Sequence, residues 1–369
     1  MLNIIFYVFI GVVVLQMVYY LGVYGKFAFA KPLSITTKRL PVSVIVCAKN
    51  DAENIKQLIP LLAAQNYPDF ELVLIDNASS DDTLDIFEEF EKQYPNLVRL
   101  VKVENNEAFW GSKKYALTLG IKAARKDYLL FIDAKCMPNS TEWIAHMSSQ
   151  FTMSKTIVLG YAAYEKKKNS FLNKIIRYDS VLTATQYFAW ARAGKPFNGN
   201  GRNLAYKKDE FFKVNGYINH IKVHMGEDSL FINEVATNKN TSICYTPESF
   251  TYRESRKSFK EWVKEKRKKT FTASFFKSAD QLQIKAFYLS QLSFIVLAIV
   301  LAALQFNWMF LVPVIIVRYI AGWVTMAQSA ARLHEKDAVY WYPVIEIILI
   351  FTQLYVNFTN LFSKPTHWK

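Results

Sequence analysis

Hydrophobic and polar residues follow two distinct patterns along this chain. Between residues 41 and 133, short apolar runs typical of buried strands are separated by segments with helical periodicity. The strand-like runs cover residues 42–48, 70–76, 98–103 and 128–133, and a helical segment follows each of the first three. Strands that alternate with helices predict an α/β fold with a doubly wound, mostly parallel sheet. In such sheets, ligands bind beyond the carboxyl ends of the strands, where Ala48, Asp76 and Asp133 fall.

Four long apolar runs lie outside this region, at residues 3–24, 287–306, 309–327 and 338–361. A bilayer is crossed by roughly 20 such residues, so each run is a candidate membrane helix. No basic residue precedes the first run, and the run is longer than the core of a signal peptide, so we interpret it as an uncleaved anchor. The last run contains Glu346 and Gln353, and it either spans the membrane or lies in the interface.

Charged residues near these runs predict their orientation. Four basic residues between positions 26 and 39 follow the first run, which places the next segment in the cytoplasm by the positive-inside rule. Arg318 lies within the third run, where a charge is costly without a partner, and Glu346 is the partner we expect. Few helices remain to form a transport pathway, so we interpret the apolar runs as anchors.

The chain therefore divides into four predicted parts. They are an N-terminal anchor (1–26), an α/β domain (40–252), a basic amphipathic segment (253–284) and C-terminal membrane helices (285–369). Lys and Arg are dense in the third part and are interleaved with aromatic residues, which is typical of a helix that lies on an anionic membrane surface. This arrangement predicts an α/β domain that works beside the bilayer.

Composition narrows the function classes. The 369-residue chain has a net charge of +14, which favours anionic partners. The charge gathers near the apolar runs, so lipid head groups explain it better than nucleic acid does. The cysteines Cys47, Cys136 and Cys244 form no CxxC pair, which disfavours a zinc site or a disulfide framework. The motifs of dinucleotide-binding proteins, P-loop NTPases, serine hydrolases and zincins are also absent from the sequence.

With these residues in view, the chain resembles family 2 glycosyltransferases, which are membrane-anchored, inverting enzymes with the GT-A fold. The resemblance covers about residues 40–270 and is carried by the order and spacing of several elements. They read VSVIVCAKNDAENI, LVLIDNASSDDT, GSKKYALTLGIKAARKDYLLFIDAKCMPNSTEW, GNGRNLAYKK, GEDSLF and EWVKEKRKKT.

The resemblance implies how a nucleotide-sugar would be held. Ala48 and Asp76 would hold the base and the ribose. Asp133 would be the first acid of an Asp-x-Asp element that holds a divalent cation, Mg²⁺ or Mn²⁺, on the diphosphate. Backbone N–H groups and cations at a helix start suit phosphate, and the residues there are Gly111, Lys113 and Lys114. The plainer alternatives are a turn acid at Asp76 and a solvated helix face at the two lysines.

The resemblance also implies a catalytic base. An inverting transfer needs one carboxylate to take the proton of the acceptor hydroxyl as that oxygen attacks the anomeric carbon. Asp228 matches this base, and Glu227 beside it would orient the acceptor. Arg202 and Asn203, in the glycine-rich loop 199–203, either face the acceptor or hold the loop in place.

Two elements depart from the family pattern. Lys135 stands where the second metal-binding acid is expected, and the Gln-x-x-Arg-Trp element is replaced on one helical face by Glu265, Lys268 and Lys269. Three explanations are open. Lys135 replaces the cation on the diphosphate, Asp133 alone holds a metal together with phosphates, or the chain binds nucleotide without transferring sugar. The opposite charge changes at Lys135 and Glu265 predict that these two side chains approach each other.

Together these features predict an integral membrane glycosyltransferase of a bacterial inner membrane, with its catalytic domain in the cytoplasm. The enzyme would move a sugar from a UDP-sugar to a lipid-linked or glycan acceptor with inversion. One alternative is a catalytically silent, nucleotide-binding scaffold of a glycan-assembly complex, and another is a lipid-binding membrane adaptor. Nucleic acid is not an expected partner.

Overall fold

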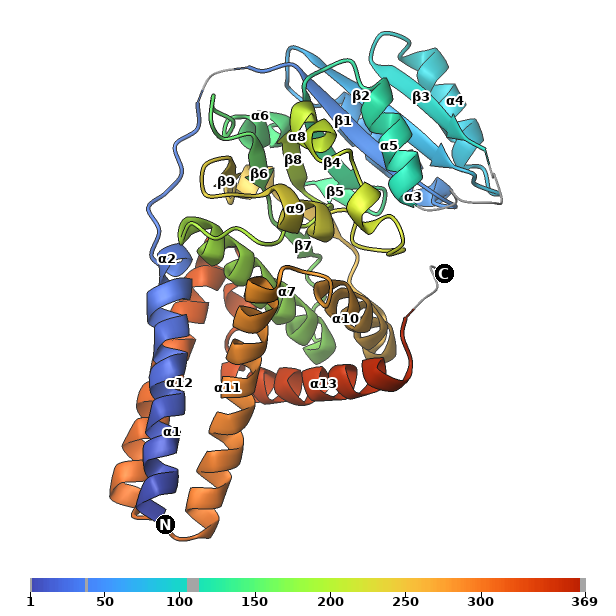
Figure 1. Ribbon diagram of the computed structural model, residues 1–369. Coiled ribbons are helices and arrows are strands. Elements are labelled where there is room, and N and C mark those ends of the chain that lie inside the picture. Colours follow the sequence, from blue (N-terminus) through green and yellow to red (C-terminus); the bar gives the residue numbers. More distant parts are fainter. Residues whose placement is uncertain (1, 37–38, 105–112, 366–369) are drawn as a thin grey trace. The chain divides into compact units, whose positions relative to one another are not determined.

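The computed structural model of the chain describes residues 2–36, 39–104 and 113–365. The chain forms two compact units, and each is described by itself. The α/β unit consists of Pro32–Lys168 and Pro196–Lys257, and the helical unit consists of Met1–Lys31, Asn169–Lys195 and Ser258–Pro365. Figure 1 labels the elements of both units.

A seven-stranded sheet forms the centre of the α/β unit, with strand order β3-β2-β1-β4-β8-β6-β9. The strands are β1 (Val42–Ala48), β2 (Phe70–Asn77), β3 (Val98–Val103), β4 (Tyr128–Asp133), β6 (Ile157–Leu159), β8 (Leu204–Lys207) and β9 (Thr241–Ile243). Strands β3, β2, β1 and β4 are parallel, and β8 runs antiparallel to both of its neighbours. The predicted α/β fold with a doubly wound, mostly parallel sheet is therefore confirmed.

Helices cover the parallel strands, which explains why these strands read as continuous apolar runs. The longer helices are α3 (Ala52–Ala63), α4 (Thr83–Gln93) and α5 (Lys113–Ala123), and the unit also contains the short helices α6 (Trp143–Ser148), α8 (Lys208–Lys213) and α9 (Ser229–Val235). Helix α5 lies close to β2, because a Cβ atom on Gly120 would come within 2.1 Å of Ile75 Cδ1. A larger residue at position 120 would push away the helix that begins with Lys113.

A smaller, three-stranded sheet belongs to the same unit, in the order β5-β10-β7. Its strands are β5 (Cys136–Pro138), β7 (Ala162–Tyr164) and β10 (Thr251–Arg253). Strand β10 pairs antiparallel with β5 and parallel with β7. Strands of three residues are too short to show a two-residue alternation, so the sequence pattern does not predict this sheet.

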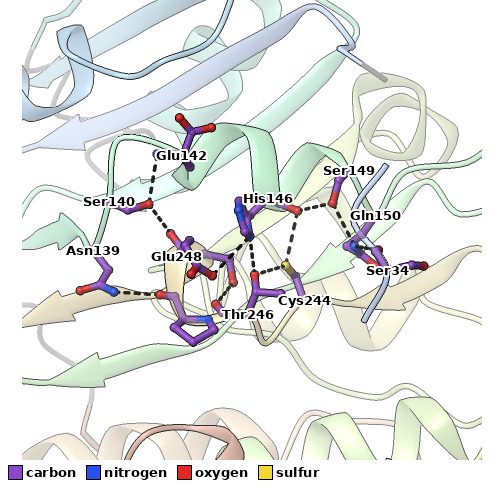
Figure 2. A network of polar contacts seen from close by, with 12 residues as sticks. Ser34, Asn139, Ser140, Glu142, His146, Ser149, Gln150, Cys244, Thr246 and Glu248 are labelled. Atoms are coloured by element: carbon purple, nitrogen blue, oxygen red, sulfur yellow. Dashed lines mark hydrogen bonds and ion pairs between the residues drawn. The ribbon is translucent and has the colours of Figure 1, made fainter. Parts of the chain in front are cut away.

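Polar contacts hold the segment that precedes β10 against α6 and against the loop that leads into α6 (Figure 2). Asn139 Nδ2 donates to the Pro247 carbonyl at 2.9 Å. His146 Nδ1 lies 2.8 Å from Thr246 Oγ1. Burial lowers the pKa of His146, so the neutral imidazole is the form that makes this contact near pH 7. These two contacts therefore hold in place the backbone that leads into β10.

The helical unit contains helices long and apolar enough to cross a bilayer, and four such helices occur within the described residues. They are Leu2–Ala28, which joins α1 (Leu2–Met17), a π-helical turn (Val18–Tyr24) and α2 (Gly25–Ala28), then α11 (Ser278–Ala303), α12 (Trp308–Arg332) and α13 (Tyr342–Phe362). Helices α1, α11 and α12 share one apolar cluster, in which Phe9 stacks on Phe294 at 5.4 Å between ring centroids. In Figure 1, α13 runs across these helices instead of alongside them.

The predicted pair between Arg318 and Glu346 is confirmed. Arg318 Nη1 lies 2.6 Å from Glu346 Oε2, and Arg318 Nη2 lies 2.7 Å from Glu346 Oε1. The Tyr20 hydroxyl donates to the same carboxylate at 2.8 Å, and Gln16 accepts from the guanidinium. A bidentate pair with further hydrogen bonds avoids an isolated charge among membrane helices.

Helices α7 (Phe171–Arg192) and α10 (Phe259–Ala273) also belong to the helical unit. The sequence places α7 within the α/β domain, so this division differs from the expected one. Arg177 of α7 donates from Nε to Glu335 Oε2 at 2.7 Å, and Asp179 lies 2.6 Å from Lys266 Nζ. Both contacts join residues far apart in the chain, and local periodicity carries no information about such pairs.

Candidate active site

The carboxyl ends of β1, β2 and β4 bring the predicted strand-end residues to one edge of the sheet. Ala48 is paired in register with Asp76, and Cys47 with Asp133. Asp76 and Asp133 therefore lie on either side of β1. This edge is where a doubly wound sheet binds its ligands.

Lys113, the first residue of α5, joins two carboxylates at this edge. Its Nζ atom lies 2.8 Å from Glu227 Oε1 and 3.8 Å from Asp133 Oδ2. Burial acts to lower the pKa of Lys113, but the carboxylates of Glu227 and Asp133 outweigh burial and raise it. The lysine therefore stays charged and holds Glu227, from the segment before α9, next to the end of β4.

Asp228 caps the amino end of α9 and faces the glycine-rich loop. Its Oδ1 accepts a hydrogen bond from Ser229 N at 2.7 Å, and its Oδ2 accepts one from Gly201 N at 2.6 Å. A Cβ atom on Gly201 would lie 2.9 Å from Asp228 Cβ, so glycine is needed for the loop to approach this closely. The sequence could show that Asp228 precedes a helix, but not that the loop at Gly201 reaches it.

Glu227 and Asp228 differ in their acidity. Burial acts to raise the pKa of Glu227, but Lys113 outweighs it and the pKa is lowered. Burial raises the pKa of Asp228, and the negative charge of Glu227 raises it further. Glu227 is therefore suited to remain an anion and Asp228 to accept a proton.

Asp133 lies in a positive electrostatic environment. Burial acts to raise its pKa, but Lys113, Arg253 and Arg202 outweigh burial and lower the pKa to about 2. Lys135 contributes its backbone N–H to Asp133 Oδ1 at 3.1 Å, while its side-chain Nζ lies 3.0 Å from Asp51 Oδ1. The ammonium of Lys135 is thus paired with an acid that the sequence analysis did not single out.

Asp76 has an unused acceptor atom. The side chain is buried, and its Oδ2 accepts a hydrogen bond from Ser79 N at 3.2 Å. Its Oδ1 is also buried and accepts no hydrogen bond from the described residues. A buried carboxylate oxygen without a donor is costly, and a donor from a ligand would remove that cost.

Lys114 has partners other than a donor substrate. Its Nζ atom donates to the carbonyls of His220 and Val223, both at 2.6 Å, and the residue is 1% exposed. Burial lowers the pKa of Lys114 to about 8. These bonds indicate that Lys114 holds the segment before Glu227, whereas the sequence predicted a contact with the nucleotide-sugar. Gly111, predicted beside it, lies outside the described residues.

Arg202 and Asn203 have different surroundings in the structure. The sequence left open whether they face the acceptor or hold the loop in place. Asn203 is fully buried, and its Nδ2 donates to the carbonyls of Tyr161 and Ser249 at 2.8 and 2.7 Å. These bonds assign Asn203 to holding the loop. Arg202 instead donates from Nη1 to the Tyr164 hydroxyl at 3.2 Å and raises the positive potential at Asp133.

Arg253, like Asp51, belongs to this site although the sequence did not indicate it. It ends β10, where it is paired in register with Cys136 of β5 and Tyr164 of β7. In the sequence, Arg253 opens a run of basic residues that reads as an interfacial segment. The sequence around Arg253 does not indicate that this residue belongs to a three-residue strand or that its charge acts on Asp133.

Part of this chain is similar in sequence to known glycosyltransferases. Residues 43–219 match the family model described as glycosyl transferase family 2. The chain contains a family 2 glycosyltransferase domain. Glycosyltransferase AglE of Haloferax volcanii is 33% identical over 111 residues, which are 29% of this chain and 34% of AglE. The Escherichia coli UDP-Glc:alpha-D-GlcNAc-diphosphoundecaprenol beta-1,3-glucosyltransferase WfaP is 26% identical over 143 residues, which are 38% of this chain and 49% of WfaP.

The GT-A fold of this domain also agrees with a solved structure. Mannosyltransferase PcManGT from Pyrobaculum calidifontis, in complex with GDP-Man and Mn²⁺, aligns over 92% of this chain and 98% of its own, with a TM-score of 0.55 and 16% identity. At that identity the likeness concerns the fold alone. The matched segments span about a third of AglE and half of WfaP, so they describe a shared domain and not a shared substrate.

The residues of the glycosyltransferase domain fit a divalent cation poorly. Asp133 supplies one carboxylate, and Lys135 occupies the position two residues on. Lys113, Arg202 and Arg253 all act on Asp133 as positive charges, and they would repel a metal ion placed there. Within the described residues, no group of three or more His, Cys, Asp and Glu side chains could hold a metal ion.

The three residues that replace the family's Gln-x-x-Arg-Trp element lie on α10, in the helical unit. Glu265 Oε1 lies 3.2 Å from Lys269 Nζ, and the Lys268 carbonyl accepts from Thr272 Oγ1 at 3.0 Å. Because Lys135 and Glu265 belong to different units, their expected approach stays a prediction. The same holds for the contact of these three residues with acceptor or diphosphate.

Proposed function

We propose that this chain is an inverting glycosyltransferase that moves a sugar from a UDP-sugar to a lipid-linked acceptor. The observation that carries the proposal is the pairing of Glu227 with Lys113 beside a half-buried Asp228 whose pKa is raised. In this arrangement the Glu227 carboxylate stays ionised because it is paired with Lys113, and the Asp228 carboxylate is able to take a proton. Both lie in the domain whose strand edge holds Asp76 and Asp133.

The reaction needs few groups because the leaving group is already good. The Asp228 carboxylate would accept the proton of the acceptor hydroxyl as that oxygen forms a bond to the anomeric carbon. The bond from that carbon to the diphosphate oxygen breaks on the opposite face, and its electron pair leaves with the nucleoside diphosphate. One general base typically contributes about 10²–10⁴-fold to such a rate, and positive charge near the diphosphate stabilises the leaving group.

The nucleoside end would lie at Ala48 and Asp76. The free Oδ1 of Asp76 is suited to accept a hydrogen bond from the uracil N3–H or a ribose hydroxyl. Hydrogen bonds between the loops after β1 and β2 would shape this end, since Ser80 N donates to Asn50 Oδ1 at 2.8 Å and Asp51 N to Thr83 Oγ1 at 2.9 Å.

Support for a lipid-linked acceptor comes from the helical unit and from the relatives. The unit contains four long apolar helices, counted over the described residues. The printed name of WfaP specifies a UDP-glucose donor and a diphosphoundecaprenol acceptor. A lipid-linked acceptor reaches an enzyme within the plane of the membrane, which gives the anchoring helices a role in catalysis. A glycan acceptor is the alternative that the acceptor screen would detect.

We further propose that α1, α11 and α12 span the membrane and that α13 lies in its cytoplasmic interface. Helix α10 packs along α13, because Gln353 Nε2 donates to Thr270 Oγ1 at 3.2 Å and Arg267 Nε donates to Asn360 Oδ1 at 3.0 Å. Helix α10 reads FKEWVKEKRKKTFTA and is too highly charged to enter hydrocarbon. A helix that carries α10 along its length therefore belongs at the surface.

The test of the proposed function is a screen of nucleotide-sugars on the purified full-length protein. The expected result is turnover of a UDP-sugar, increased by polyprenyl-diphosphate sugar acceptors, that Asp228→Asn lowers at least about 100-fold while the affinity for UDP is retained. A nucleotide-binding scaffold would bind UDP but show no turnover that depends on Asp228. A lipid-binding adaptor would show no nucleotide affinity, and either result would reject the proposal.

A further inference from the structure

Arg253 is a largely buried arginine whose guanidinium has no bonding partner among the described residues. The residue is 7% exposed. Within residues 2–36, 39–104 and 113–365, no group accepts a hydrogen bond from its guanidinium or forms an ion pair with it. A guanidinium offers five N–H donors, and those of Arg253 are not among the fully enclosed donors of the described residues, so they are available to a ligand. The arrangement is understandable if an anion occupies the space in front of this side chain during function.

The position of Arg253 is fixed by the fold around it. Strand β10 is held by β5 on one side and β7 on the other. The segment that leads into β10 is in turn bonded to Asn139, in the loop before α6, and to His146 of α6 (Figure 2). A side chain carried on such a strand is held in place before any ligand arrives, which lowers the entropy cost of binding.

The positive charge of Arg253 acts at the predicted diphosphate position. Arg253 and Arg202 are, after Lys113, the largest positive influences on the Asp133 carboxylate. Arg202 lies across Tyr164, with its guanidinium carbon 5.6 Å from the ring centroid, and Tyr164 is the register partner of Arg253. Arg202 therefore contacts the residue of the small sheet that is paired with Arg253.

Ser255 adds a second unsatisfied group two residues further along the chain. The residue is 3% exposed, and its Oγ has no hydrogen-bond partner among the described residues. Ser255 lies just beyond β10, in the irregular segment that follows Arg253. A guanidinium and a hydroxyl two residues apart in the chain, neither with a partner among the described residues, suit the acceptor-rich surface of a phosphate group.

We propose that Arg253, assisted by Ser255 and Arg202, binds the diphosphate of the nucleotide-sugar and stabilises it as the leaving group. This inference rests on the proposed function and names the groups that do in this chain what a divalent cation does elsewhere. Arg253 binds two diphosphate oxygens in a bidentate manner, and the charge of Arg202 adds to it. Lys135 therefore need not replace the metal, and its pairing with Asp51 is compatible with this assignment.

The experiment measures nucleotide affinity for the full-length protein in detergent and EDTA by calorimetry. UDP and GDP, each with its nucleoside, are titrated into wild type, Arg253→Gln, Arg253→Lys and Arg125→Gln. Arg125 is exposed and precedes β4 at the opposite end of the sheet, so its variant loses the same charge at a distant place. Melting temperatures are recorded without nucleotide, together with the affinities.

Wild type should bind one of the two diphosphates more tightly than its nucleoside in EDTA. Arg253→Gln should weaken that diphosphate about 10- to 100-fold, as expected for a charge-assisted hydrogen bond of about 1.5–3 kcal/mol, and leave the nucleoside unchanged. Arg253→Lys should restore part of the loss, and Arg125→Gln should change nothing. The melting temperature of Arg253→Gln should be no lower than that of wild type, because the guanidinium has no partner to lose.

Equal diphosphate affinity in wild type and Arg253→Gln overturns the inference, as does a wild type that binds neither diphosphate in EDTA. If Arg253→Gln does not fold, Ser255→Ala decides, with a loss of about threefold expected and no loss overturning the inference. If the protein transfers sugar but its diphosphate affinity does not depend on Arg253, only the inference is rejected, and the proposed function stands. If the protein binds diphosphate through Arg253 but transfers no sugar, only the proposed function is rejected.

Discussion

Glu227 and Asp228 are adjacent in the chain, yet their carboxylates have different partners. Glu227 Oε1 lies 2.8 Å from Lys113 Nζ, whereas Asp228 accepts hydrogen bonds from the backbone N–H groups of Gly201 and Ser229. Lys113 lowers the pKa of Glu227 against the effect of burial, and burial together with Glu227 raises the pKa of Asp228. A pair of acids whose pKa values are moved apart allows one to act as base while the other stays ionised.

Glu227→Gln should move the acidic limb of the kcat/KM profile to lower pH. Asp228 acts as a base only when it is ionised, so activity falls as the pH drops through its pKa. The negative charge of Glu227 raises that pKa, and Lys113 lowers it. Removing the negative charge of Glu227 takes away the effect that raises the pKa of Asp228. It also frees Lys113 to act more strongly on Asp228, so both changes lower the pKa of Asp228.

The measurement is a pair of pH–rate profiles over about pH 4–8, which spans the carboxylate range. Glu53→Gln is the matched control, because Glu53 lies exposed on α3. A limb that stays in place, or moves to higher pH, would show that Asp228 is not the titrating base.

Lys114→Met should lower the stability of the fold and leave donor affinity nearly intact. The lysine donates to the buried segment at His220 and Val223. Its loss leaves two carbonyls without these bonds, at a cost of about 2 kcal/mol. The check is a lower melting temperature with an unchanged dissociation constant for UDP, and Lys122→Met, exposed on the same helix, serves as control. A large loss of UDP affinity at wild-type stability would return Lys114 to the donor site.

The parallel half of the sheet was predictable because its strands are long and uniformly apolar. The predicted bounds 42–48, 98–103 and 128–133 are those of β1, β3 and β4. Asp76 and Asp133 could be placed because the end of such a strand is visible in the sequence. Register then follows from the parallel pairing of neighbouring strands.

The rest of the site depends on contacts that local sequence does not encode. Asn203 looks like a loop residue, but a buried position bonded to Tyr161 and Ser249 makes it part of the core. Arg253 looks like the start of a basic surface, but β5 and β7 enclose it in a sheet. In both cases the partners lie some 40 to 120 residues away in sequence, so the pattern around the residue cannot reveal them.

Lys135→Asp should make nucleotide binding depend on a metal ion. The variant places a second carboxylate two residues from Asp133 and removes a positive charge, which favours Mn²⁺ bound jointly with phosphate oxygens. Wild-type affinity for UDP should change less than about threefold on adding Mn²⁺, because Arg253 already supplies charge, whereas the variant should gain about tenfold. Lys135→Ala is the control, since it also frees Asp51 but adds no ligand. A strong Mn²⁺ response in wild type would contradict the assignment of diphosphate binding to the arginines.

The orientation of α13 determines where the chain ends relative to the membrane. If α1, α11 and α12 span and α13 lies in the interface, the residues after Phe362 are on the same side as the α/β unit. If α13 also spans, they are on the opposite side. The first arrangement keeps the basic residues after α13 in the cytoplasm, in agreement with the positive-inside rule.

Fusions of a reporter that is active on only one side of the bacterial inner membrane would distinguish these arrangements. A fusion after Ser363 should report the cytoplasm, with Lys336 as a cytoplasmic reference and Gln305, between α11 and α12, as the reference for the other side. Substituting Phe351 and Phe358, which are exposed on one face of α13, with Glu should weaken binding of the helix to the interface and leave the location of the fusion unchanged. If the reporter after Ser363 behaves like the one after Gln305, α13 crosses the bilayer. Helix α10 would then have to leave its place along α13, because the lysines and arginines of α10 cannot enter hydrocarbon.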